Sequence, residues 1–201
     1  MKQKIKIVII IAIAVVGALL IYNHFENTNN HEILVNRFSK EYKLVDKNNI
    51  YKYSSIEEIL DIFEGGTGVI FFCTPESEWC QKYAYYLNAS LKENNVKEIN
   101  YLNIKEYREL NTSKYQKIVD YLEQYVYRDD VNNKKLFMPD VTFVNSGIIV
   151  GHNNDTSLIE SDADPEEYWK DSVIKTFKNN MKEYVNKMNE ELILDDIEET
   201  K

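Results

Sequence analysis

Two cysteines give this chain its clearest capacity for chemistry. Cys73 and Cys80 are the only two in 201 residues, and they fall within one short segment. A thiolate is the nucleophile of thiol–disulfide exchange, and two cysteines in an oxidising compartment can pair. Glu76 and Glu78 stand close to Cys80 in sequence, and their like charge disfavours its thiolate. The residues therefore allow either redox chemistry or a structural role for the pair.

The predicted elements around the cysteines would place them at the end of a strand and the start of a helix. Residues 68–73 form a continuous apolar run with the length of a strand buried on both faces. Pro75 ends that run, and a helix is expected over residues 77–94. Cys73 then closes the strand, and Cys80 lies in the first turn of the helix.

The rest of the pattern alternates between strands and helices. Ser55 and Glu58 form a capping box at the start of a predicted helix, and Gly65-Gly66 ends it. Further strands are expected at 49–53 and 97–104, a helix at 115–126, a hairpin at 141–150, and a long last helix from Asp164-Pro165 to about Glu191. This order predicts an α/β fold with a mixed sheet, parallel first and antiparallel at the end, and helices on both faces.

Two segments carry a family resemblance. Phe72–Cys80, after a buried strand and at the start of a helix, resembles the active-site loop of thioredoxin-like proteins. Met138-Pro139-Asp140, before the hairpin, is similar to the cis-proline loop of that fold. Together they resemble small bacterial membrane-anchored or secreted thioredoxin-like proteins related to bacteriocin-transport accessory proteins. The resemblance covers residues 49–190 and implies a thioredoxin-like mixed sheet flanked by helices, with a cis bond before Pro139.

The sequence departs from that family at the active-site motif. The family's CxxC falls on Ser77-Glu78-Trp79-Cys80, so Ser77 replaces the exposed, nucleophilic cysteine. Ser77 cannot do redox chemistry, although it can cap the helix. Cys80 matches the resolving cysteine, and Cys73 is the remaining candidate partner. Three states stay open: a Cys73–Cys80 disulfide, two free thiols, or Cys80 alone as a monothiol.

The resemblance also implies a groove for a partner, formed by Ser77, Trp79, Met138 and Pro139. On the residues alone, Pro139 is equally a loop proline entering an edge strand, and Trp79 is equally a packing residue of the helix. Two functions follow. The first is a redox-inactive or weakly active accessory module that binds a protein partner, favoured by Ser77. The second is a thiol–disulfide oxidoreductase using Cys80 with Cys73.

An uncharged apolar run, Ile7 to Tyr22, predicts a transmembrane anchor. As a helix it would be about 24 Å long, at the short end of a bilayer span. Lys2, Lys4 and Lys6 precede it, so the positive-inside rule places the N-terminus in the cytoplasm and the rest outside. The run ends in bulky residues rather than a small-residue cleavage site. We expect a single-pass cell-membrane protein that contacts the lipid bilayer through residues 7–22, with secretion after signal cleavage as the alternative.

Charge limits the class of partner. Three of the 24 basic residues precede the apolar run, which leaves 21 Lys and Arg against 33 Asp and Glu, a net charge of −12. This excess argues against nucleic acid, and no glycine-rich phosphate motif supports a nucleotide. His24, His31 and His152 lack metal-ligand spacing and are expected at the solvated surface, so neither metal nor cofactor is expected. The expected partner is a membrane or envelope protein or peptide.

The expected organisation has five parts. They are a cytoplasmic N-terminus (1–6), the transmembrane anchor (7–22), a tether with a short helix (23–48), the thioredoxin-like domain (49–192) and an acidic tail (193–201).

Overall fold

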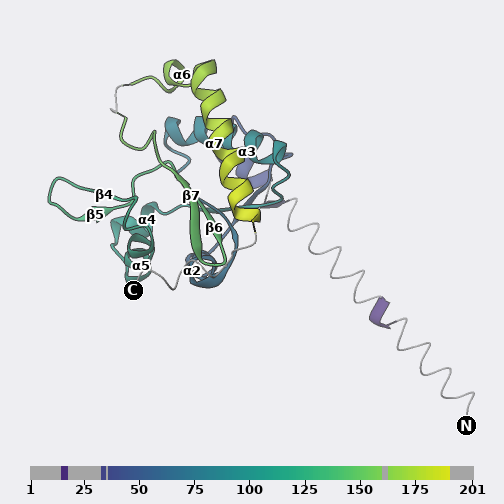
Figure 1. Cartoon of the computed structure of the whole chain (residues 1–201), viewed down its shortest axis with the longest axis horizontal. Helices are drawn as coiled ribbons and strands as arrows, with labels where there is room; N and C mark the ends of the chain where they lie inside the picture. The colour runs from purple at the N-terminus through teal and green to yellow at the C-terminus, as the bar shows by residue number, and fades with distance from the viewer. Residues whose placement is uncertain (1–14, 18–32, 35, 160–162, 191–201) are drawn as a thin grey trace, which may run out of the picture.

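The protein folds around one mixed sheet. The structure, a computed structural model, describes residues 15–17, 33–34, 36–159 and 163–190 (Figure 1). Five strands lie in the order β1-β3-β2-β6-β7. Their bounds are β1 Tyr51–Tyr53, β2 Gly68–Phe72, β3 Ile99–Leu102, β6 Asp140–Asn145 and β7 Ile148–Asn153. The first three pair in parallel, whereas β6 and β7 are antiparallel to their neighbours. The predicted α/β class and mixed sheet are confirmed.

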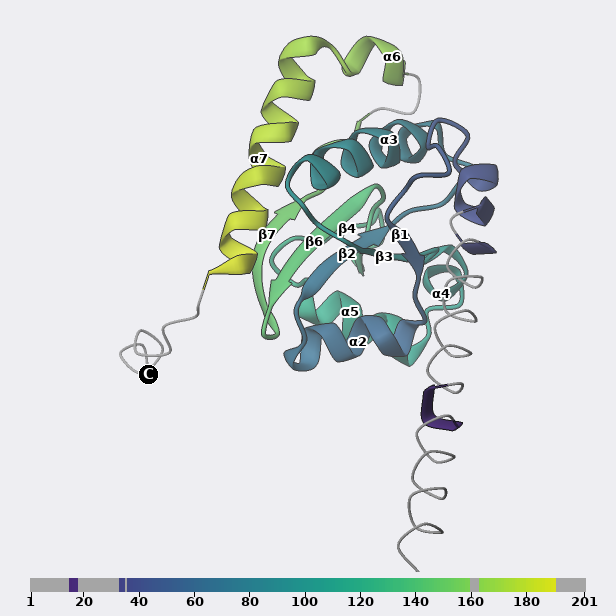
Figure 2. The same ribbon diagram turned by 90° about the vertical axis from the view of Figure 1, so that its right-hand side faces the viewer.

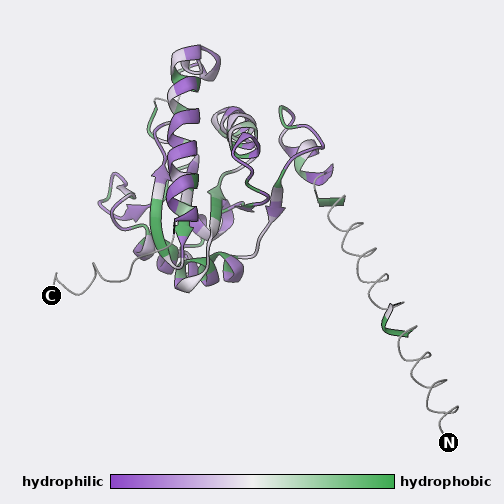
Figure 3. Ribbon diagram, turned by 45° about the vertical axis from the view of Figure 1, so that its right-hand side comes forward, coloured by the Kyte–Doolittle hydropathy of each residue, from purple (hydrophilic) through white to green (hydrophobic). Residues whose placement is uncertain are grey.

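Helices cover both faces of the sheet. Figure 2 shows α3 (Glu78–Glu93) on one side of the strands, and α2 (Ile56–Gly65) with α5 (Ser113–Tyr121) on the other. The last helix, α7 (Asp171–Asn189), packs against α3, β6 and β7. The sheet therefore separates two apolar cores, one under α3 and α7 and one under α2 and α5. In Figure 3 the hydrophobic colour is concentrated in the central strands, whereas helix α7 is largely hydrophilic.

The α2 helix forms where its sequence signals predict. The Ser55 side chain accepts from the Glu58 amide while the Glu58 carboxylate accepts from the Ser55 amide, which completes the capping box. Its apolar residues at helical spacing are all buried, and Gly66 caps the C-terminus. The helix is thereby fixed at both ends before β2 begins.

The β6–β7 hairpin combines a predicted turn with an unpredicted bulge. Ser146 and Gly147 form the two-residue turn with φ of 50° and 80°, a conformation that glycine adopts without strain. The register shifts by one residue between Phe143 and Val144. From Gly151 onward, each residue of β7 therefore pairs with a β6 residue one position away from its partner in a regular hairpin. A slip of one residue exchanges the two faces of a strand.

The N-terminal helical segment belongs to the folded unit. Residues 36–41 are helical, and the segment of residues 36–45 contributes Phe38, Tyr42 and Val45 to the core beneath α3. The Phe38 ring stacks between the rings of Tyr42 and Tyr51, at centroid distances of 4.3 and 3.9 Å. This side of the sheet, at β1, is therefore closed by aromatic packing.

The C-terminal helix differs from its prediction, because the expected single helix is broken. A short α6 (Pro165–Tyr168) precedes α7, and Trp169 and Lys170 separate them. Trp169 leaves helical geometry, with ψ of 59°, and its side chain is buried against the rings of Tyr86 and Phe177. Burial of this indole therefore determines where the helix ends.

Three short elements escaped prediction. They are α4 (Lys105–Glu109) and the paired strands β4 (Tyr127–Arg128) and β5 (Lys134–Lys135).

Most of the predicted anchor, residues 7–22, lies outside the described residues, as do residues 1–6, the tail 193–201, and both His24 and His31. Among the residues that are described, no helix has the length and apolar character needed to cross a bilayer.

Candidate functional site

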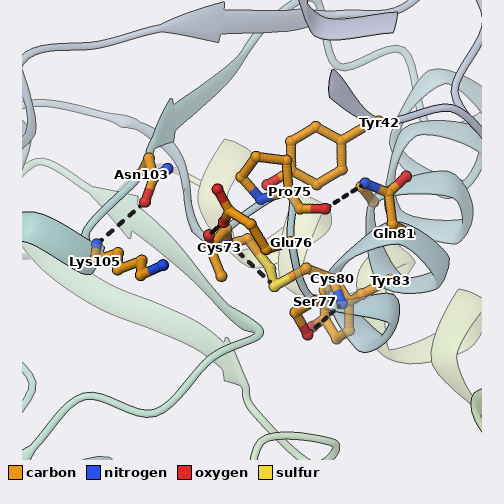
Figure 4. Close-up of a disulfide and its surroundings, with 12 residues drawn as sticks. Tyr42, Cys73, Pro75, Glu76, Ser77, Cys80, Gln81, Tyr83, Asn103 and Lys105 are labelled. Atoms are coloured by element: carbon orange, nitrogen blue, oxygen red, sulfur yellow. Dashed lines mark hydrogen bonds between the residues drawn. A yellow bond between two sulfur atoms is a disulfide. The ribbon is translucent and has the colours of Figure 1, made fainter. Parts of the chain in front are cut away.

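The two cysteines meet at the edge of the sheet where β2 ends. Cys73 directly follows β2, and Cys80 lies in the first turn of α3 (Figure 4). Their Sγ atoms are 2.08 Å apart and their Cα atoms 5.8 Å apart, which is a disulfide. Of the three states that the sequence leaves open, the structure has this one. Both residues are fully buried, at 0% exposure.

Ser77 occupies the start of α3, where the family resemblance places the nucleophilic cysteine. Its Oγ accepts from the Cys80 amide at 3.3 Å and so caps the helix. The Thr74 amide lies 3.3 Å from Cys80 Sγ, and the Thr74 hydroxyl donates to the Glu76 carboxylate. The segment between the cysteines is thus held by its own hydrogen bonds as well as by the disulfide.

Gln81 connects this segment to the N-terminal part of the chain through hydrogen bonds. Its Nε2 donates to the backbone oxygens of Pro75 at 2.7 Å and Glu41 at 2.8 Å. Its Oε1 accepts from the Lys43 amide at 2.9 Å. One side chain therefore joins α3, the segment next to the disulfide and residues 41–43. No sequence pattern predicts this role, because the partners are backbone groups, two of them about 40 positions away in the chain.

Pro139 lies at the same edge as the disulfide. The Met138–Pro139 peptide bond is cis, and Pro139 is buried. Phe72, the last residue of β2, pairs with Asp140, the first residue of β6. Cys73 directly follows Phe72, and Pro139 directly precedes Asp140. Met138 is partly buried and contacts both apolar cores. Strand pairing therefore brings Cys73 and Pro139 to one edge.

Trp79 and Ser77 lie beside that edge, on the first turn of α3, and both are half-buried. The Trp79 ring packs edge-to-face against Tyr168 of α6, with ring centroids 5.4 Å apart. Lys82 of α3 also forms an ion pair with Glu166 of α6. Helix α6 thus packs on the start of α3, and part of Trp79 remains exposed.

A buried His–Asp pair lies next to Pro139, and sequence reasoning missed it. The expectation that His152 is a solvated surface residue is wrong: its side chain is 4% exposed, and that of Asp140 is 2% exposed. His152 Nε2 lies 2.9 Å from Asp140 Oδ2, and the Thr142 hydroxyl donates to Asp140 Oδ1 at 3.2 Å. The Tyr125 ring stacks on the imidazole at 4.2 Å. The bulge in β6–β7 brings these groups together, because it pairs His152 with Thr142.

Tyr83 links α3 to the end of β7. Its hydroxyl donates to Asn153 Oδ1 at 2.7 Å. Burial raises the pKa of Tyr83 well above its usual range, and the charges of Asp140 and Asp155 raise it further. The phenol therefore stays neutral and acts as a hydrogen-bond donor inside the core.

Comparison with known proteins leaves the family open. No protein-family model, curated protein or solved structure matches the chain. Within the described ranges, no cluster of three or more His, Cys, Asp or Glu side chains could hold a metal ion. The site thus consists of a buried disulfide, a capping serine, a cis-proline and a neighbouring His–Asp pair.

Proposed function

We propose that the protein is a membrane-anchored, extracytoplasmic accessory module of the thioredoxin-like class, in which the Cys73–Cys80 disulfide is structural. The observation that carries this proposal is the complete burial of both cysteines at the sheet edge. An incoming thiolate must reach a sulfur atom before it can exchange. A disulfide without exposure is protected from that attack.

Ser77 supports the same function. It stands at the helix start, where free backbone amides would lower the pKa of a thiol. A serine there keeps the capping hydrogen bond to the Cys80 amide and has no redox chemistry. Ser77 therefore caps the helix at the position of the family's nucleophilic cysteine but has no redox reactivity.

The proposed partner is a membrane or envelope protein or peptide. It would contact the edge where Ser77, Trp79 and Met138 are partly exposed, beside the buried Pro139. The predicted anchor, residues 7–22, would hold this edge outside the cytoplasm, with the N-terminus inside; release by signal cleavage is the alternative. Since the outward part carries a net charge of −12, a partner with a basic surface would be attracted to it.

Thiol–disulfide exchange is the competing function, and one experiment separates the two. The full-length protein in detergent is treated with an alkylating reagent before and after denaturing reduction, and its exchange with a peptide dithiol, whose thiolate would attack the Cys73–Cys80 disulfide, is measured. We expect no alkylation of the native protein and no exchange.

The matched variant restores the family motif. The double substitution Cys73→Ala/Ser77→Cys puts a thiol at the helix start, two residues before Trp79-Cys80, and Cys73→Ala alone is its control. We expect exchange to appear only in the double variant. A wild-type protein that exchanges as fast as the double variant would show that the oxidoreductase function is the correct one.

A further inference from the structure

A polar cleft lies between helices α4 and α5 and the β4–β5 hairpin, which are neighbours in Figure 1. We call it the Arg108 cleft. Its volume of about 520 Å³ is within the range of about 300–1,000 Å³ that ligand pockets usually span. Among the described residues that line it, amide and charged side chains predominate and Val119 is the one aliphatic side chain. The cleft therefore suits a small polar ligand.

The charge of the lining is opposite in sign to that of the chain. Four of the lining residues are basic and two are acidic, whereas the whole chain has a net charge of −9. One of the two acids, Asp129, is engaged within the hairpin, where its Oδ1 accepts from the backbone amides of Val131 at 3.1 Å and Asn133 at 2.8 Å. The other, Asp120, is exposed to water, which weakens its field. The cleft therefore favours an anion.

Arg108 presents unused donors to the cleft from α4. Its Nη1 donates to the backbone oxygen of Leu136 at 3.4 Å, and the amide of Leu136 donates to the Tyr115 hydroxyl at 3.1 Å. Leu136 and Tyr115 are both buried, so the guanidinium is held against a fixed part of the fold. Within residues 36–159, Nε and Nη2 of Arg108 have no hydrogen-bond partner, and neither is among the buried unpaired polar atoms. Both nitrogens are therefore open to solvent and free to bind a ligand.

Arg128 lines the same cleft from the hairpin. It pairs with Lys134 across β4 and β5, so the two side chains lie on one face of the hairpin. The Lys134 ammonium forms an ion pair with Glu123, just past the end of α5, so this face is turned toward α5. Arg128 is exposed, and its Nη1 donates to the backbone oxygen of Asn132 at 2.8 Å. Its other two nitrogens have no partner in the described part of the chain, so a second guanidinium is available to a ligand.

We propose that the Arg108 cleft binds a small hydroxylated phosphate monoester, such as a sugar phosphate, through the guanidinium groups of Arg108 and Arg128. The planar fork of a guanidinium matches the oxygens of a phosphate, and the monoester brings a charge of about −1.5 to −2 at pH 7. Gln116 Nε2 donates to Asn111 Oδ1, which leaves Asn111 Nδ2 and Gln116 Oε1 to pair with hydroxyl groups.

The acidity of the whole chain limits the ligand to a small one. A polyanion or an anionic lipid surface would be repelled by that charge, whereas a small ion can enter a cleft whose local charge is positive. The inference depends neither on the redox state of the disulfide nor on the proposed protein partner.

Glucose 6-phosphate is the probe. Glucose and glucuronate are matched controls, because they carry a hydroxyl and a carboxylate in place of the phosphate. The full-length protein in detergent is titrated with each while the backbone amide signals of residues 128–136 are followed by NMR. We expect glucose 6-phosphate to shift these signals in a saturable way, glucose to leave them unchanged, and glucuronate to bind about tenfold more weakly because it has a single negative charge. Inorganic phosphate, which lacks the hydroxylated ring, should also bind more weakly.

Two variants test the role of the guanidinium groups. Arg128→Gln removes one of them at an exposed position, and we expect the affinity for glucose 6-phosphate to fall about tenfold. Lys117→Gln removes an exposed positive charge of α5 that does not line the cleft, and affinity should stay the same. Thermal unfolding of both variants checks that they fold. The proposal is overturned if glucose 6-phosphate produces no saturable shift, if glucuronate or inorganic phosphate binds equally well, or if both variants bind like the wild-type protein.

Discussion

The Cys73–Cys80 disulfide should stabilise the fold by an amount that its short loop determines. The perturbation is reduction of both sulfurs, or the double substitution Cys73→Ala/Cys80→Ala, which avoids a buried lone thiol. The cysteines are separated by 7 positions, and the chain-entropy relation then gives about 2.4 kcal/mol at 25 °C. For a chain of this size, that loss corresponds to a fall in melting temperature of about 5–10 °C.

Urea unfolding at 25 °C measures this difference between oxidised and reduced wild-type protein. Because Cys73 and Cys80 are fully buried, we also expect dithiothreitol to reduce the native protein slowly, and faster as urea approaches the unfolding midpoint. The double alanine variant serves as the control, since reductant should not change its midpoint. The reasoning is refuted if oxidised and reduced wild-type protein unfold at the same urea concentration, or if the native protein is reduced as quickly as the unfolded chain.

Three further predictions concern the surroundings of the site. His152→Ala should lower the free energy of unfolding by about 3–5 kcal/mol, because it leaves the buried Asp140 carboxylate without its imidazole partner; urea unfolding checks this, and adding Asp140→Ala should recover part of the loss. Gly151→Ala should cost about 1–3 kcal/mol, because the new Cβ would lie 2.4 Å from Tyr184 Cγ; adding Tyr184→Ala should relieve this clash, and a cost that stays the same would disprove it. Gln81→Ala should cost about 1–3 kcal/mol through its three lost backbone contacts and should speed amide exchange at residue 43; unchanged exchange there would show that Gln81 does not hold the segment.

Local sequence signals predicted much of the fold, because they act between residues close in the chain. The Ser55–Glu58 capping box fixed the start of α2, and Ser77 and Asn94 flank α3 as the pattern indicates. The continuous apolar run predicted β2 as a buried central strand. Each of these signals depends on hydrogen bonds or periodicity within one element.

The parts that could not be predicted depend on contacts between elements. A regular two-residue hairpin would pair His152 with Val141 and turn the imidazole away from Asp140; the bulge places it opposite Thr142 instead. The break at Trp169 arises from packing against Tyr86 and Phe177, which no pattern within α7 reveals. The disulfide could not be predicted for the same reason, because the distance between Cys73 and Cys80 depends on the tertiary structure.

The packing of the N-terminal segment has a mechanical consequence. A pull on the chain from the N-terminal side reaches Arg37 and Phe38, which both contact β1: the Arg37 guanidinium lies over the Tyr53 ring, and the Phe38 ring stacks on Tyr51. Tension therefore passes into the edge strand of the sheet through ring contacts, and into α3 through the hydrogen bonds of Gln81. A load from that side would act on the contacts of residues 36–45 before it reaches the central strands.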